Sequence, residues 1–116
     1  MLQVREQQHH STKVLFLTGH FTHDTAIGIQ ARILGAKEVG CYHIILDFSG
    51  LTEIDPRGIG ELLYWYHNMK PYYVQVSIVN PPTPIWNQLD LGYVSEFVPI
   101  YESEQEAMEH TLLTSE

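Results

Sequence analysis

The chain has 116 residues, the usual length of one domain, and its hydrophobic fraction of 44% supports a packed core. Six Lys and Arg against 14 Asp and Glu give a formal net charge of −8, which disfavours a nucleic-acid partner because the chain would repel a phosphate backbone. One cysteine excludes an internal disulfide, and the absence of both a membrane-length apolar run and a secretory signal predicts a cytoplasmic protein without direct membrane insertion.

The first part of the chain is predicted to form two strands. Residues 2–9 could make an edge strand, with a turn near residues 10–12. The short apolar run of residues 14–17 is typical of a central strand, and Gly19 is expected to break it.

A helix is predicted to follow these strands. Thr22 or Asp24 could cap its N-terminus, and residues 35–40 are expected to end it. Its predicted core-facing stripe comprises Ala26, Ile29 and Ile33, with Ile27, Ala31 and Leu34 widening it.

A second strand and helix come next. Residues 42–48 have the composition of a strand, which is expected to end at residues 49–50. Asp55 followed by Pro56 is typical of an N-cap and a first helical position, because the missing N–H of proline costs nothing there. The helix is expected to stop before Pro71. Its predicted core-facing residues are Ile59, Leu62, Leu63, Tyr66 and Met69.

This choice of core face turns Trp65 toward solvent, together with its neighbour Tyr64. An exposed tryptophan beside the Asp55 turn would be a typical interface anchor. The alternative is partial burial of Trp65 against Pro71 or against the next helix.

The remainder of the chain repeats the strand–helix pattern. Residues 73–79 alternate, with Val74, Val76 and Ile78 on one face, and residues 97–100 predict another short strand. A third helix is predicted to follow, capped by Thr83 and with Pro84 at its first position. Its buried residues are expected to be Trp86 and Leu89, and Gly92 is expected to end it. A last helix is predicted from the capping box of Ser103 and Glu106, with Ala107 and Met108 in it.

Strands that alternate with helices imply crossover connections and a largely parallel sheet. We therefore predict an α/β fold, with a four- to five-stranded mixed sheet and about four helices mainly on one face. One domain is expected over residues 1–116, with a core of about residues 12–112.

The segment IILDFSGLTEIDPRGIG at residues 44–60 resembles the STAS domain, the module shared by anti-sigma-factor antagonists and the cytoplasmic tails of sulphate transporters. The resemblance covers about residues 14–110. Its further matches are LTG at residues 17–19, VNP at 79–81, LDL at 89–91 and IYESE at 100–104.

The resemblance implies a non-enzymatic module that needs no cofactor and docks onto an anti-sigma factor with serine kinase activity, or onto another STAS protein. The implied partner-binding residues are Asp55, Pro56, Arg57, Gly58, Trp65, Thr22 and Asp24. Asp55 would cap and shape the loop, Arg57 would supply contact specificity, and Gly58 would permit close approach by the sheet or by a partner.

The resemblance also shows a departure. In antagonists regulated by kinases, the residue after the loop aspartate is a serine or threonine that takes the phosphate, whereas here it is Pro56. Proline has no hydroxyl, so this position cannot be phosphorylated. Other hydroxyls that could carry a switch are Thr22, Thr25, Ser49 and Thr52, although helix capping and turn hydrogen bonds are the favoured interpretation of the first two.

Seven histidines raise the question of a metal, because His20, His23 and Asp24 are close in sequence. The region before His20 resembles the end of a strand and not a helix, so exposed loop histidines are the favoured interpretation and no metal site is predicted. The sequence also lacks a nucleophile elbow, a P-loop and a dinucleotide-binding glycine motif, and we expect no catalytic residues.

Three hypotheses about function follow from the sequence. The first is a regulator that binds an anti-sigma partner constitutively, as an antagonist or a decoy. The second is a scaffold or assembly subunit, such as a stressosome-like core component or the STAS subunit of a phospholipid-transport complex, and a homodimer is compatible with either. The third is a nucleotide- or lipid-sensing module with its ligand between the loops near Thr22 and Asp55.

Overall fold

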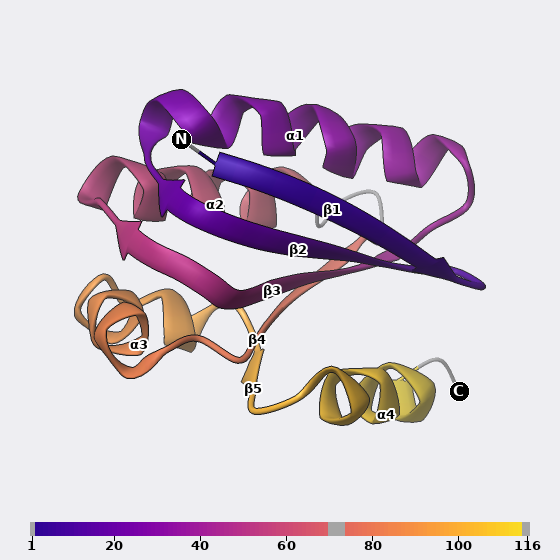
Figure 1. Ribbon diagram of the computed structural model, residues 1–116. Helices are drawn as coiled ribbons and strands as arrows, with labels where there is room; N and C mark the ends of the chain where they lie inside the picture. The colour runs from indigo at the N-terminus through magenta and orange to yellow at the C-terminus, as the bar shows by residue number, and fades with distance from the viewer. Residues whose placement is uncertain (1, 70–73, 115–116) are drawn as a thin grey trace.

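The computed structural model describes residues 2–69 and 74–114 (Figure 1). In chain order the elements are β1 (Leu2–His9), β2 (Thr12–Phe21), α1 (His23–Glu38), β3 (His43–Ile54), α2 (Pro56–Met69), β4 (Gln75–Val79), α3 (Thr83–Leu91), the 3-10 helix η2 (Val94–Glu96), β5 (Ile100–Tyr101) and α4 (Glu104–Thr114). Across these two ranges, no helix combines the length and the apolar character needed to cross a bilayer.

The strands form one mixed sheet in the order β1-β2-β3-β4-β5. β1 is antiparallel to β2, and the other neighbouring pairs are parallel. Each parallel pair is connected through a helix, as crossover connections require (Figure 1). The predicted α/β fold is confirmed, with a five-stranded mixed sheet and four α-helices in the described part of the chain, and β1 is the predicted edge strand.

The main core lies between the sheet and the helices α1, α2 and α3. Alternate residues of the central strands point into it: Leu15 and Leu17 of β2, Ile44, Leu46 and Phe48 of β3, and Val76 and Ile78 of β4. On the opposite face a smaller cluster joins Ala107 of α4 to Val14, Ile45 and Val79. The helices therefore lie mainly on one face of the sheet, as predicted.

Two strands are longer than predicted. Gly19, with φ 110°, does not end β2, because the pairing with β3 continues to Phe21 through two register shifts. β3 likewise passes residues 49–50 and ends at Ile54. Gly50 permits this pairing, since a Cβ there would lie 2.8 Å from Thr18 Oγ1 and 2.9 Å from the Leu17 carbonyl oxygen.

The predicted helix α1 is confirmed, but its stripe is narrower than predicted. Ala26, Ile29 and Ile33 are buried, and the helix continues to Glu38. The three residues expected to widen the stripe are exposed: Ile27, Ala31 and Leu34. They lie on the outer side of α1, because the sheet covers only one side of this helix.

The second half of the chain also departs from the prediction in detail. Trp86, predicted to be buried, is 38% exposed, whereas Leu89 is buried. Thr83 is the first residue of α3 rather than its cap, because the extended Pro82 occupies the N-cap position. The last strand is Ile100–Tyr101 instead of residues 97–100, and the exposed Phe97 follows η2.

Other predictions for this half are confirmed. Val74, Val76 and Ile78 are buried, Gly92 is the C-cap of α3, and the Glu106 N–H donates to Ser103 Oγ at 3.1 Å. Ser77, which lies on the opposite face of the strand from these three residues, is also buried. The predictions that concern Tyr73 and Pro71 lie outside the described residues.

Candidate functional site

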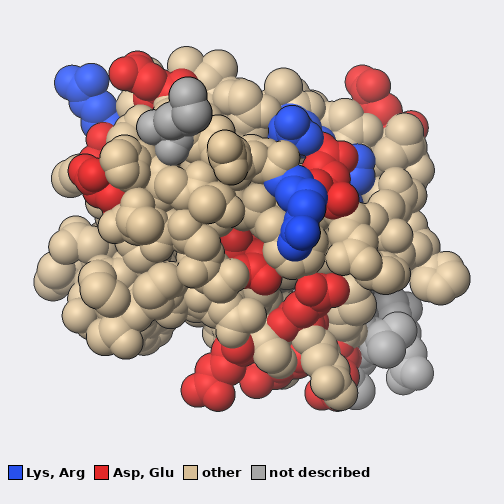
Figure 2. Space-filling model, in the orientation of Figure 1, with Lys and Arg blue, Asp and Glu red and all other residues tan. Residues whose placement is uncertain are grey.

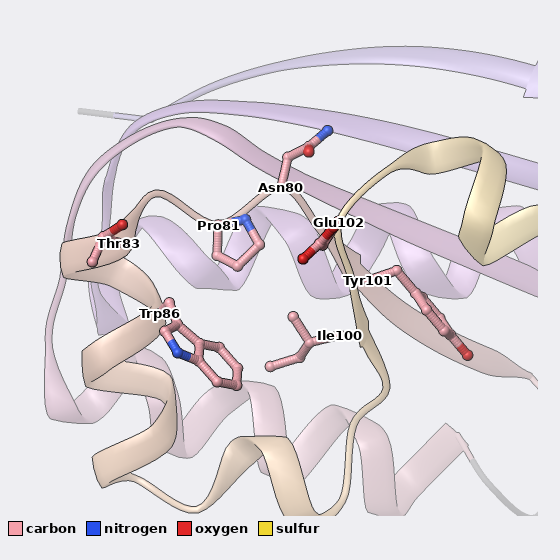
Figure 3. A pocket seen from close by; sticks show the side chains of 7 residues that line it. All are labelled: Asn80, Pro81, Thr83, Trp86, Ile100, Tyr101 and Glu102. Carbon is pink, nitrogen blue, oxygen red and sulfur yellow. The ribbon is translucent and has the colours of Figure 1, made fainter.

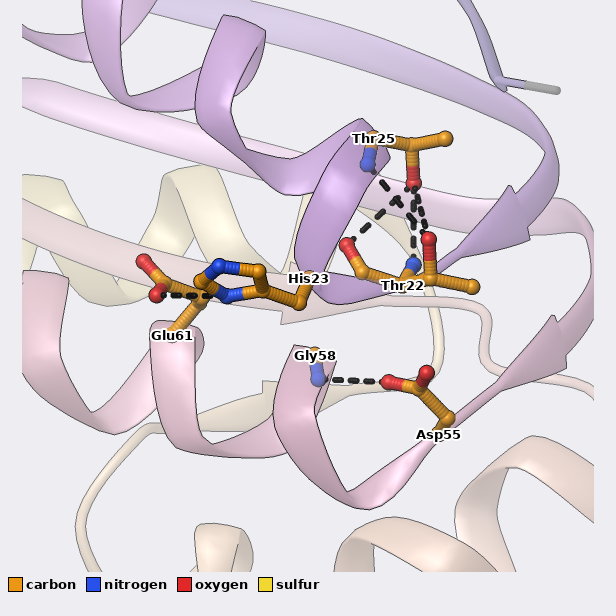
Figure 4. Close-up of polar contacts among 6 residues, drawn as sticks. All are labelled: Thr22, His23, Thr25, Asp55, Gly58 and Glu61. Atoms are coloured by element: carbon orange, nitrogen blue, oxygen red, sulfur yellow. Dashed lines mark hydrogen bonds and ion pairs between the residues drawn. The ribbon is translucent and has the colours of Figure 1, made fainter.

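The loops that the sequence singled out meet at one edge of the sheet (Figure 4). β2 and β3 are parallel neighbours, so their carboxyl ends and the helix starts that follow lie side by side. The Asp55 N–H donates to the Phe21 carbonyl oxygen at 3.2 Å and joins the two loops. His23 Nδ1 and Glu61 Oε1, 3.3 Å apart, link α1 to α2. We call this surface, formed by residues 22–25 and 55–58, the α1–α2 edge.

Asp55 caps α2, as predicted. Its Oδ1 accepts the Gly58 N–H at 2.7 Å, and its carbonyl oxygen accepts the Ile59 N–H at 3.0 Å. Pro56 is the first residue of the helix. Pro56 and Arg57 are exposed, while Asp55 is half-buried. The turn therefore presents a proline ring and a guanidinium at a helix N-terminus.

Gly58 is buried and faces the sheet. A Cβ at this position would lie 2.6 Å from the Phe21 carbonyl oxygen and 2.8 Å from Phe21 Cδ1. Of the two predicted roles, close approach by the sheet is confirmed. A direct contact between Gly58 and a partner stays a prediction, and in this conformation Phe21 covers the residue.

Trp65 was predicted to be an exposed anchor, and this prediction is wrong. The side chain is 1% exposed and packs edge-on against Phe21, with ring centroids 5.7 Å apart. α2 is rotated so that Trp65, between Leu62 and Met69, faces the sheet, and the predicted core residue Tyr66 is only half-buried. Trp65 therefore cannot contact a partner unless α2 moves away from the sheet. Tyr64 is exposed, as predicted.

The first two candidate hydroxyls form a capping box at the start of α1. The Thr22 N–H donates to Thr25 Oγ1 at 2.9 Å, and Thr22 Oγ1 accepts the Thr25 N–H at 3.4 Å. Thr25 Oγ1 also donates to the His20 carbonyl oxygen at 2.8 Å. The predicted helix cap at Thr22 is confirmed, and Asp24 is an exposed residue of the first turn.

The other two hydroxyls belong to β3. Thr52 is exposed and its Oγ1 donates to the Gly19 carbonyl oxygen at 3.3 Å. Ser49 is exposed, and its N–H donates to Asp47 Oδ1 at 2.9 Å. Phosphorylation of any of the four hydroxyls stays a prediction.

The histidines of this region pair with carboxylates from neighbouring elements. His20 Nε2 lies 3.9 Å from Glu53 Oε2, and His23 contacts Glu61. Within residues 2–69 and 74–114, no group of three or more His, Cys, Asp or Glu side chains is arranged to hold a metal ion.

Sequence reasoning missed two exposed apolar residues beside the α1–α2 edge. Leu91 and Tyr93 are 73% and 65% exposed. Gly92 between them packs on the first turn of α2, since a Cβ there would lie 2.8 Å from Ile59 Cγ2. The signal in the sequence was an apolar residue on each side of a helix-stopping glycine, but only the fold shows which helix they approach.

Comparison with known proteins gives a consistent result. The family model of the STAS domain matches residues 2–107. An anti-sigma F factor antagonist from Paenibacillus polymyxa is 29% identical over 110 residues, which cover 92% of each chain. The structure of the anti-sigma factor antagonist SpoIIAA in its unphosphorylated form superposes with a TM-score of 0.77 at 21% identity, over 94% of this chain and 96% of that one. For an anti-sigma factor antagonist from Mycobacterium paratuberculosis the TM-score is 0.81 at 15% identity, with 95% and 93% covered.

Proposed function

The chain belongs to the STAS domain family and is anti-sigma factor antagonist-like, and on this premise we propose that it is a regulator that binds an anti-sigma factor kinase through the α1–α2 edge. We further propose that this binding is not switched by phosphate on the Asp55 turn. The protein then acts by association with a partner and not by catalysis.

The observation that carries the proposal is the exposed Pro56-Arg57 pair at the N-terminus of α2. A phosphate at a helix start adds negative charge close to unpaired N–H groups and to the positive end of the helix dipole, so it changes binding strongly. Neither Pro56 nor Arg57 has a hydroxyl that could form a phosphoester. Arg57 instead places a permanent positive charge on this surface.

The surroundings of this pair fit a protein-binding surface. Leu91 and Tyr93 add exposed apolar and aromatic area beside the first turn of α2. Tyrosine and arginine are enriched in protein interfaces and often carry a large share of the binding energy. The edge itself is held by backbone contacts and caps, so it is preorganised and loses little conformational entropy on binding.

The test uses the purified anti-sigma factor kinase of the same organism. We expect a stable complex by size-exclusion chromatography with either ADP or ATP, and no phosphate on residues 55–58 by mass spectrometry. Arg57→Glu should weaken the complex about tenfold or more, because it reverses a charge at the interface. Lys37→Glu, in the last turn of α1, makes the same charge change away from the α1–α2 edge and should leave binding unchanged.

A double variant tests the switch separately. Pro56→Ser with Arg57→Ser supplies hydroxyls and keeps the Asp55 cap, so the kinase should phosphorylate the turn, and ATP should then dissociate the complex. The proposal fails if ATP releases the wild-type protein from the kinase, or if Arg57→Glu and Lys37→Glu bind equally well.

A further inference from the structure

A second candidate site, which shares no lining residue with the α1–α2 edge, lies between the start of α3 and the strand β5 (Figure 3). It is a cavity of about 460 Å³ whose lining includes Pro81, Trp86, Ile100 and Glu102. These side chains surround a common space, whereas the Tyr101 ring points away from Trp86 (Figure 3). We call this cavity the Trp86 pocket.

The walls of the Trp86 pocket combine an aromatic surface with a carboxylate. The indole of Trp86 is 38% exposed and Ile100 is half-buried, so the floor is apolar but accessible. Glu102 is exposed, and among the described residues its carboxylate has no hydrogen-bond or ion-pair partner. An indole face with an adjacent free carboxylate attracts a cation that is attached to an apolar stem.

The charge distribution strengthens this preference. Residues 71–116 contain seven Asp and Glu and no Lys or Arg, whereas residues 1–70 contain seven acidic and six basic residues. In Figure 2 acidic side chains gather at the bottom of the visible face, in the region of β5 and α4, and no basic side chain is seen there. Most of the net charge of the chain thus belongs to the segment that carries the pocket, and it favours a positively charged occupant.

The structure points to an occupant, and we propose that the Trp86 pocket binds an arginine side chain of a partner protein. A planar guanidinium can stack on the indole while it donates hydrogen bonds to the Glu102 carboxylate. The pocket is open, with Thr83, Trp86 and Glu102 all exposed at its rim. A small molecule binds well only when a pocket covers most of its surface, which an open pocket does not do. An arginine side chain belongs to a partner protein, and the surface of that protein can cover the open side of the Trp86 pocket.

The proposal goes beyond the proposed function and uses none of the residues of the α1–α2 edge. Its test can therefore succeed or fail independently of any kinase. The probes are acetyl-arginine amide, its neutral analogue acetyl-citrulline amide, and the peptide acetyl-Leu-Arg-Leu-amide. Binding is followed by two-dimensional NMR through the indole N–H signal of Trp86, and the signal of the buried Trp65 reports that the fold is intact.

The peptide should shift the Trp86 signal saturably, with an affinity in the millimolar range or better that falls at higher salt. Glu102→Gln should weaken binding about three- to fivefold, as expected for one exposed ion pair. Glu96→Gln removes the same charge at an exposed position outside the pocket and should have little effect. Trp86→Ala should abolish binding, measured then by the backbone signal of Glu102.

Four results would overturn the proposal. The first is an equal response to arginine and citrulline derivatives, and the second is equal binding by the Glu102→Gln and Glu96→Gln variants. The third is equal affinity for acetyl-arginine amide and for the peptide, which would assign the pocket to a free small cation. The fourth is concentration-dependent self-association that the peptide reverses, which would assign the pocket to a contact between copies of this chain.

Discussion

Two glycines of α2 allow a direct test of how this helix packs on the sheet. A Cβ at Gly58 would lie 2.6 Å from the Phe21 carbonyl oxygen, a distance that side chains do not adopt. A Cβ at Gly60, two residues later in the same helix, would meet nothing within 4 Å. The substitutions Gly58→Ala and Gly60→Ala therefore make the same chemical change in opposite environments.

The expected magnitudes follow from two contributions. Alanine in place of glycine inside a helix stabilises the folded state by up to about 1 kcal/mol. At Gly58 the new methyl group would meet a backbone oxygen, which cannot rotate away, and overpacking of this kind costs about 1–3 kcal/mol. We expect Gly60→Ala to raise the free energy of unfolding by about 0.5–1 kcal/mol, and Gly58→Ala to lower it by up to about 2 kcal/mol.

The assay is urea unfolding followed by circular dichroism, with the free energy of unfolding obtained by linear extrapolation. Because the gain in helix propensity is similar in both variants, the difference between them isolates the contact with Phe21. In thermal unfolding the same difference should appear as opposite shifts of Tm by a few degrees. A Gly58→Ala protein as stable as the Gly60→Ala protein would refute the packing described for α2.

Three further predictions concern single residues. Asp55→Ala should lower the free energy of unfolding by about 1 kcal/mol through loss of the α2 cap, while Asp55→Asn should lose much less, as measured by urea unfolding. Burial lowers the pKa of His43 to about 4. As the pH falls below about 6.5, the unfolded chain therefore binds a proton at this residue that the folded protein does not bind. The free energy of unfolding carries no penalty from this residue well above pH 6.5 and is about 2 kcal/mol lower at pH 5. His43→Gln should remove this part of the pH dependence, and an unchanged slope of stability against pH would contradict the prediction. Finally, Trp86→Phe should leave a blue-shifted emission from Trp65 that acrylamide quenches poorly, and strong quenching would show that Trp65 is exposed after all.

The candidate site was predictable where its signals are local. The Asp55-Pro56 cap and the Thr22 cap depend on side chains that bond to N–H groups three residues away, and both are present in the structure. Trp65 was misplaced because the apolar residues of α2 allow two core faces, one centred near Leu63 and Tyr66 and one near Leu62 and Trp65. A shift of one residue rotates the helical face by about 100°, and only the shape of the sheet beneath α2 selects between them.

The amino-acid sequence by itself determined the order of the strands and α-helices, the mixed sheet, the caps of α1, α2 and α4, and the absence of a hydroxyl at Pro56 and Arg57. These features follow from interactions between residues that are close along the chain, or from the residue type alone. Only the tertiary structure decided that Gly58 contacts Phe21, that Leu91 and Tyr93 flank the first turn of α2, and that Trp86 and Glu102 share a pocket. These are contacts between segments that are far apart in the sequence. Their geometry depends on how the helices pack on the twisted sheet, and no short stretch of sequence specifies this packing.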